Sequence, residues 1–144
     1  MIKVTEQPFD PWQTLQAHER AMSHMAGKYG ATACFVGTMR DFNEGDTVHA
    51  MTLEHYPGMT ERHLERFCRE AQERWPISET LIVHRCGELH PGDPIVLVAV
   101  WSAHRGAAFE ACRFLIESLK HQAPFWKKER LEGRERWVEH NTPS

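Results

Sequence analysis

The stretch of residues 102–129 constrains what this 144-residue chain can fold into more than any other. It carries apolar residues with the spacing i, +4, +7, +11, namely Ala108, Cys112, Leu115 and Leu119. That spacing predicts an amphipathic helix whose apolar face packs on the rest of the protein. Pro124 prevents the helix from continuing far past Lys120, because proline has no N–H to donate. The sequence therefore predicts a long helix that ends near a lysine, after which the chain turns back against it.

The remaining segments predict two further helices and several short strands. The expected helices run from about residue 10 until Gly27 and over residues 60–75. The expected strands cover residues 31–39, 48–56, 80–86 and 94–103. Because no glycine-rich βαβ run is present, we expect an α+β fold with a mainly antiparallel sheet and helices packed on it. One domain is expected over residues 1–144, with a disordered tail at about residues 140–144.

The overall charge and hydropathy exclude two classes of partner. The formal net charge is −3, so a generally basic surface that coats nucleic acid is not expected. The longest apolar run, residues 95–101, is too short to cross a bilayer. The first eight residues lack the apolar core of a signal peptide. We therefore expect a cytoplasmic protein that binds neither nucleic acid nor membrane.

The cysteines and histidines show no spacing typical of a metal site. The four cysteines are far apart and lie in apolar segments: Cys34, Cys68, Cys86 and Cys112. This pattern favours buried free thiols in a reducing compartment over a redox or thiolate–metal role. The ten histidines include no HExxH motif, and the chain has no Walker loop, GxGxxG or GxSxG. We therefore expect neither a metal nor a bound cofactor.

Two lysines of the 102–129 stretch are candidate catalytic residues. Lys120 could simply be a lysine at a helix C-terminus, where it interacts favourably with the helix dipole. Its apolar neighbours and the returning Phe125–Trp126 pair favour another interpretation, because burial lowers the pKa of an amine and makes it usable as acid, base or nucleophile. Lys127 follows that pair and places a second cation nearby.

Three further cationic or imidazole side chains stand at the ends of predicted strands. His104 and Arg105 lie between a strand and a helix, where helix N–H groups favour an anion such as phosphate. Arg105 could bind two phosphate oxygens at once. The alternative is a surface pair at a turn. Arg40 ends its strand in a similar way, and alone it is weak evidence of a site.

Several motifs in order resemble the large subunit of molybdopterin synthase, the MoaE family. The match extends from the first helix to about Glu129. It rests on CFVGTMR at residues 34–40, LEHYPGM at 53–59, HRCGEL at 84–89 with PGD at 91–93, HRGAAFEAC at 104–112, LK at 119–120 and PFWKKE at 124–129.

The resemblance implies an α/β hammerhead fold and a sulfurtransferase of molybdenum cofactor biosynthesis. In that family, the thiocarboxylated C-terminus of a small ubiquitin-like subunit of MoaD type delivers sulfur to cyclic pyranopterin monophosphate (precursor Z), giving the dithiolene of molybdopterin. Family members form a homodimer with a small subunit at each end, a heterotetramer, and the sulfur arrives already activated, so no cofactor is needed. The implied catalytic residues are Lys120 and Lys127, and the implied substrate-binding residues are Arg40, His104 and Arg105.

Some questions about the site and the function stay open at this point. Arg134, Arg136 or residues of a second protomer could complete the site. A non-catalytic adaptor that binds phosphate or a ubiquitin-like tail would need the arginines but no lysine at position 120. RNA binding by residues 125–137 is a third interpretation, which the interleaved glutamates of that segment weaken.

Overall fold

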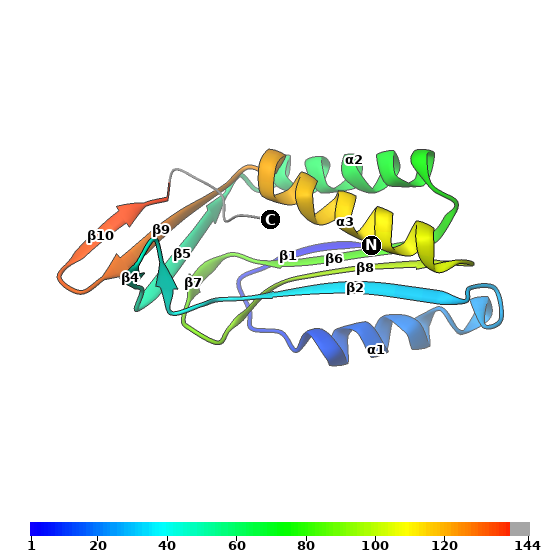
Figure 1. Cartoon of the computed structure of the whole chain (residues 1–144), viewed down its shortest axis with the longest axis horizontal. Coiled ribbons are helices and arrows are strands. Elements are labelled where there is room, and N and C mark those ends of the chain that lie inside the picture. The colour runs from blue at the N-terminus through cyan, green and yellow to red at the C-terminus, as the bar shows by residue number, and fades with distance from the viewer. Residues whose placement is uncertain (139–144) are drawn as a thin grey trace.

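In the computed structural model, the described residues 1–138 form two four-stranded sheets, a short hairpin and three helices (Figure 1). The helices are α1 (Pro11–Ala21), α2 (Met59–Arg74) and α3 (Arg105–Gln122), with a short 3₁₀ turn at Ser23–Met25. The strands of the first sheet are β1 (Ile2–Thr5), β2 (Ala31–Thr38), β6 (Ile77–Arg85) and β8 (Pro94–Ser102). Those of the second are β5 (Ala50–His55), β7 (Gly87–Leu89), β9 (Phe125–Leu131) and β10 (Arg134–Trp137), and the hairpin is β3 (Phe42–Asn43) with β4 (Asp46–Thr47).

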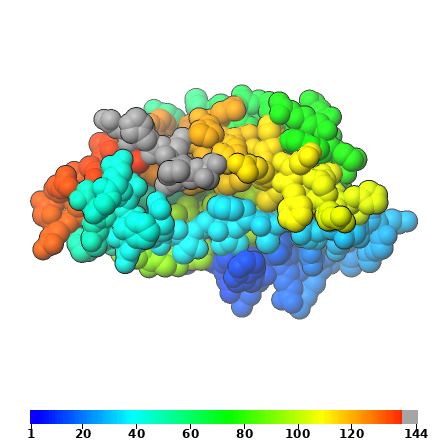
Figure 2. Space-filling model, viewed as in Figure 1, coloured from blue at the N-terminus to red at the C-terminus, as the bar shows by residue number. Residues whose placement is uncertain are grey.

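The first sheet has the order β1-β6-β8-β2 and lies between helices on both faces (Figure 1). Only the β1–β6 pair within it is parallel. Strand β8 shows why both faces are covered, because its side chains alternate between two apolar clusters. Val96, Val98 and Val100 pack with residues of α2 and α3, whereas Leu97 and Trp101 pack beneath α1. In the space-filling view, α1 (blue) accordingly projects on the side opposite α2 and α3 (Figure 2).

The second sheet, β10-β9-β5-β7, is fully antiparallel and stands at one end of the first (Figure 1). Strand β6 continues through Cys86 into β7, so a single chain segment joins the two sheets. A separate apolar cluster fills the space beneath the second sheet: Met39, Val48, Met51, Leu53, Leu89 and Leu131. The C-terminal end of α3 and the start of β9 therefore lie where the two sheets meet.

The expected α+β class with a mainly antiparallel sheet is confirmed. At the start of α1, Asp10 accepts hydrogen bonds from the N–H groups of Trp12 and Gln13, and Pro11 occupies the first helical position. The side chain of Trp12 is 61% exposed. Glu19, which interrupts the apolar face of α1, accepts a hydrogen bond of 3.1 Å from the indole N–H of the buried Trp101.

Other expectations about local structure need correction. The sequence did not indicate strands β1, β3, β4, β7, β9 and β10, of which β9 and β10 bear directly on the site. All four cysteines are free, but Cys34, which lies on the edge strand β2, is exposed. The tail expected at about residues 140–144 falls outside the described residues. No helix in the described part of the chain is long and apolar enough to span a membrane.

Candidate active site

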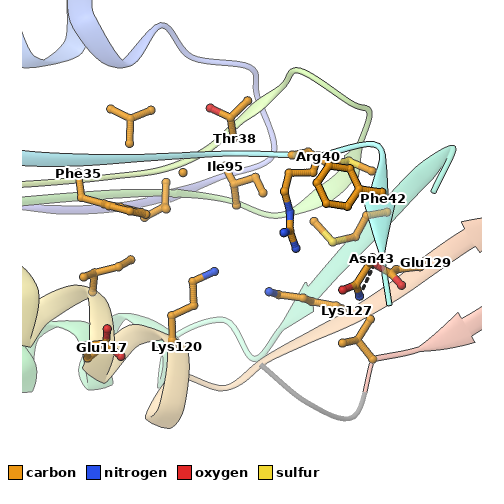
Figure 3. A pocket seen from close by; sticks show the side chains of 17 residues that line it. Phe35, Thr38, Arg40, Phe42, Asn43, Ile95, Glu117, Lys120, Lys127 and Glu129 are labelled. Carbon is orange, nitrogen blue, oxygen red and sulfur yellow. Dashed lines mark hydrogen bonds between the residues drawn. The ribbon is translucent and has the colours of Figure 1, made fainter. Parts of the chain in front are cut away.

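A cavity of about 410 Å³ lies between the end of β2, the last turns of α3 and the strand β9 (Figure 3). The hairpin of β3 and β4 contributes Phe42 and Asn43 to its wall. Apolar side chains form much of the remainder: Phe35, Val36, Met39, Met51, Ile95, Val96, Ile116 and Val138. Three cations open into this largely apolar space, namely Arg40, Lys120 and Lys127. The cavity can therefore receive a ligand that is anionic at one end and apolar elsewhere.

Lys120 and Lys127 reach the cavity from two different elements and point toward one another (Figure 3). Lys120 lies in the last turn of α3, on the same side as Ile116. Lys127 is the third residue of β9, and strand alternation places it inside the cavity while the neighbouring Lys128 lies on the other face. Lys128 is paired there with Glu135 at 2.9 Å.

The two amines compete for protons. Burial, together with the nearby charge of Lys120, lowers the pKa of Lys127 to about 8. Burial also lowers the pKa of Lys120, whereas its hydrogen bond with Lys127 opposes that shift. A bond between two amines favours one protonated partner and one neutral partner. Lys127 therefore gives up its proton first, and Lys120 remains the ammonium that donates to it.

Replacing Lys127 with methionine is expected to raise the free energy of unfolding at pH 7 by about 1–2 kcal/mol. The gain is no larger because the side chain is partly exposed and solvent screens its charge. Below pH 8 the wild-type lysine is charged in both states, so the folded state bears the full cost of burying the charge. Between pH 8 and the ordinary pKa of 10.5 the folded state releases the proton first, and the gain should shrink. Urea unfolding at pH 7 and pH 10 measures the gain.

The control for this stability measurement is Lys128→Met, which removes a lysine from the outward face of the same strand. It should give no gain at pH 7, because Lys128 is paired with Glu135 and is not desolvated in the cavity. A gain for Lys127→Met that is equally large at pH 10 would contradict the assigned cost of charge burial.

Arg40 is exposed at the mouth of the cavity, at the end of the segment that follows β2. Its guanidinium lies over the ring of Phe42, 4.9 Å from the ring centroid. Its charge lowers the pKa of both Lys120 and Lys127. No carboxylate in the described part of the chain pairs with it. Arg40 can therefore bind an incoming anion through two parallel N–H groups.

A buried carboxylate that the sequence did not indicate fixes the far wall of the cavity. Glu129 is 5% exposed and accepts hydrogen bonds from Asn43 Nδ2 at 3.0 Å and Arg136 Nε at 2.9 Å. Arg136 also donates to Asp46 at 2.8 Å and to the backbone oxygen of Asn43 at 3.0 Å. This network ties the β3–β4 hairpin to β9 and β10. Arg136 thereby holds Glu129 and Asn43, which line the cavity, in place.

Glu129→Ala is expected to lower the midpoint of thermal unfolding by about 5–10 °C, because it leaves the hairpin without its buried acceptor. Differential scanning calorimetry measures the shift. The matched control is Glu135→Ala, which removes an exposed carboxylate from the adjacent strand and should change the midpoint by less than about 2 °C. Equal shifts in the two variants would contradict a structural role for the network.

His104 and Arg105 do not line this cavity. His104 is the N-cap of α3 and Arg105 its first residue, and both are exposed. Because a helix rises 1.5 Å per residue, they lie about 24 Å along the axis from Lys120. Of the five residues implied by the sequence, the fold thus brings together Arg40, Lys120 and Lys127 and leaves the other two at the opposite end of α3 (Figure 1).

The side chains of the cavity can bind an anion and transfer protons, and its carboxylates are not arranged to coordinate a metal ion. Among residues 1–138, no three His, Cys, Asp or Glu side chains are placed so that they could hold a metal ion. Partly buried amines with lowered pKa values beside an anion-binding group are a common arrangement in sites that use general acid–base chemistry.

Comparisons with known proteins agree on one family. The family described as "MoaE protein" matches residues 4–122. The molybdopterin synthase catalytic subunit of Pseudomonas aeruginosa is 50% identical over 139 residues, which cover 96% of this chain and 89% of that protein. Molybdopterin synthase from Staphylococcus aureus superimposes with a TM-score of 0.84 at 34% identity, covering 96% of both chains.

A more distant structure shares the fold. It is the complex of subunits 1 and 2 of molybdopterin-converting factor from Helicobacter pylori, with a TM-score of 0.78 at 21% identity, covering 96% of this chain and 90% of that one. The matched family model, the sequence relatives and the solved structures thus converge. The chain belongs to the MoaE family, whose curated relatives are the catalytic subunits of the sulfur-transferring enzyme molybdopterin synthase.

Proposed function

We propose that this chain transfers sulfur from the thiocarboxylated C-terminus of a small ubiquitin-like subunit to cyclic pyranopterin monophosphate, forming the dithiolene of molybdopterin. One observation carries the proposal: two partly buried amines with lowered pKa values face each other in one cavity, beside Arg40, which pairs with no carboxylate among residues 1–138. Both reactants are anions, since the sulfur donor ends in a thiocarboxylate and the acceptor carries a phosphate. The cations of the cavity attract both.

The two lysines divide the proton transfers between them. Lys120, which keeps its proton longer, stabilises the thiocarboxylate and donates a proton to the oxygen that leaves the pterin carbon as the carbon–sulfur bond forms. Water then cleaves the acyl–sulfur bond, which leaves the sulfur on the pterin and a carboxylate on the small subunit. Lys127, with a pKa of about 8, supplies the neutral amine that accepts a proton during attack of the sulfur. Positioned proton transfer of this kind accelerates a reaction by about 10²–10⁴-fold.

The partner is a small subunit of MoaD type whose extended tail enters the cavity. Gly37 lines the cavity, and a side chain at this position would crowd its wall, since a Cβ would lie 2.8 Å from Val96 and 3.2 Å from Phe35. Free thiols throughout also suit a reducing cytoplasm, which is the location we propose.

The catalytic assembly is proposed to be a homodimer of this chain with a small subunit at each end. His104 and Arg105 are too far from Lys120 to bind the same substrate within one chain. If they bind the pterin phosphate, they do so in the cavity of the second copy. This arrangement makes each site depend on both protomers.

A reconstitution tests the proposed function. The purified chain is mixed with precursor Z and a thiocarboxylated small subunit, and the product is measured as its fluorescent oxidised pterin. Product that requires both the chain and the thiocarboxylate would support the synthase. Tight binding of the small subunit without product would instead favour an adaptor that shares the fold.

A further inference from the structure

His84 is a buried histidine that the proposed function leaves unused. It is the penultimate residue of β6 and is 7% exposed. Its ring stacks on Phe125 of β9, with the centroids 4.0 Å apart and the planes inclined by 15°. The stacking fixes the plane of the imidazole at the point where the two sheets and the end of α3 meet.

The backbone determines which nitrogen of this ring carries the proton. Nδ1 of His84 lies 2.7 Å from the backbone oxygen of Arg85, which can only accept a hydrogen bond. Nδ1 is therefore the donor, and Nε2 presents a lone pair. Nε2 makes no hydrogen bond to the described residues and is not among their fully enclosed, unbonded polar atoms. The ring thus retains one unused acceptor.

The ring is held neutral by its surroundings. Burial lowers the pKa of His84 to about 3, and the charges of Lys120, Lys127 and His55 act in the same direction. The hydrogen bond to the oxygen of Arg85 opposes this shift without overcoming it. At neutral pH the imidazole is therefore an acceptor at Nε2, not a third cation beside the lysines.

A second, smaller cavity of about 50 Å³ brings His84 and the lysine pair together. Lys120 and Lys127 line both this cavity and the large one, so they stand between the two. The other residues around the small cavity are apolar, among them Leu53, Ile95 and Leu119. A space of this size can hold a water molecule, and a buried water needs two to four polar partners. Three polar side chains line this cavity: His84, Lys120 and Lys127.

We propose that His84 is a positioning residue for the lysine pair, acting through one water in the small cavity. The water donates a hydrogen bond to Nε2 of His84, and its oxygen accepts one from the ammonium shared by Lys120 and Lys127. No bond to carbon or sulfur is made or broken in this step, and the imidazole takes up no proton. The inference rests on the proposed function only for its effect on turnover.

The water restrains the amines and stabilises their charged form. Without it, the ammonium loses an acceptor in an apolar space, and the pKa of the pair falls further. The amines also lose the contact that orients them toward the large cavity. His84 is then needed for the position and protonation of the lysines, although it touches neither reactant.

Two amide substitutions of His84 distinguish the roles of its two ring nitrogens. His84→Asn can still donate to the oxygen of Arg85 but has nothing at the place of Nε2, whereas His84→Gln places an amide near it. In the reconstituted synthase, His84→Asn is expected to lower kcat by about 10- to 100-fold, the value of a hydrogen bond to a charged group. It should also move the alkaline-side pKa of the rate profile down by about one unit. With His84→Gln, both kcat and the alkaline-side pKa should return most of the way to their wild-type values.

His55→Gln is the control, because His55 also lies against Phe125, at 5.9 Å, but lines neither cavity. Its pH profile should coincide with that of the wild type. A His84→Asn profile that is reduced in height but unshifted would mean that His84 only supports packing, and would overturn the proposal.

Nitrogen NMR of the wild-type chain tests the inference without a variant and without turnover. Between pH 5 and pH 8, His84 should show a protonated Nδ1, an unprotonated Nε2 and no titration, with cross-relaxation to a long-lived water. A ring that is protonated at Nε2, titrates in this range or shows no such water would overturn the proposal. Because this readout needs no substrate, it stays valid even if the wild-type chain forms no product.

Discussion

Lys120→Ala is expected to lower the rate of sulfur transfer by about 10²–10⁴-fold while leaving the fold intact. The side chain lies at the end of α3 and contributes a buried charge, not apolar packing, so its removal should not destabilise the chain. Single-turnover formation of the fluorescent pterin, with the thiocarboxylated small subunit in excess, measures the rate. Binding of the small subunit should be measured beside it, to separate chemistry from docking.

The residual activity of Lys120→Ala carries a second test. The charge of Lys120 and its hydrogen bond both lower the pKa of Lys127, so their loss should let that pKa rise. The acid-side limb of the rate profile, which reports protonation of the base Lys127 and lies near pH 8 in the wild type, should therefore move to higher pH. A limb that does not move would show that the two amines titrate independently.

Lys128→Ala is the matched control for the catalytic lysines. Lys128 differs from Lys127 by one position in β9, which turns its side chain to the opposite face, against Glu135 and the ring of Trp137. Its replacement should change the rate by less than about twofold, because exposed ion pairs contribute little. A loss as large as that of Lys120→Ala would contradict the assignment of the cavity.

The elements that could be predicted from the sequence are those that bury a single apolar face in a single hydrophobic core. The spacing of Leu64, Phe67, Cys68 and Ala71 predicted α2, and all four are buried. Strand β9 escaped prediction because its inward positions are Phe125, Lys127, Glu129 and Leu131. Charged residues point inward there, since Lys127 and Glu129 line the cavity of the site, and the usual alternation of apolar and polar residues is lost.

The site was only partly predictable for a related reason. Lys120 and Lys127 lie close in sequence on either side of a chain reversal, so their meeting could be expected from Pro124. Arg40 joins them only through the pairing of β2 with β8 and the packing of α3 on that sheet. Glu129 and His84 depend on partners more than six residues away, and no local spacing reveals such contacts.

Mixing two impaired variants is expected to restore activity if each site is built from both protomers. Arg105→Ala alone should weaken transfer by about 10- to 100-fold through loss of a charge-assisted contact to the phosphate. Lys120→Ala keeps only the small residual activity given above. In a mixed dimer, the cavity of the Arg105→Ala chain keeps its Lys120 and receives Arg105 from the Lys120→Ala chain, so one site is complete.

The fraction of wild-type activity that returns follows from the number of complete active sites in the mixture. Random exchange makes half of the dimers mixed, and each mixed dimer has one complete site of two, so about a quarter of wild-type activity should return. Each variant is unfolded and refolded alone as the control, then together, with product formation measured per protomer. If Arg105 acted within its own chain, no mixed dimer would contain a complete site. The mixture would then show only the mean of its two components, and the 24 Å between the helix ends would have to be bridged in some other way.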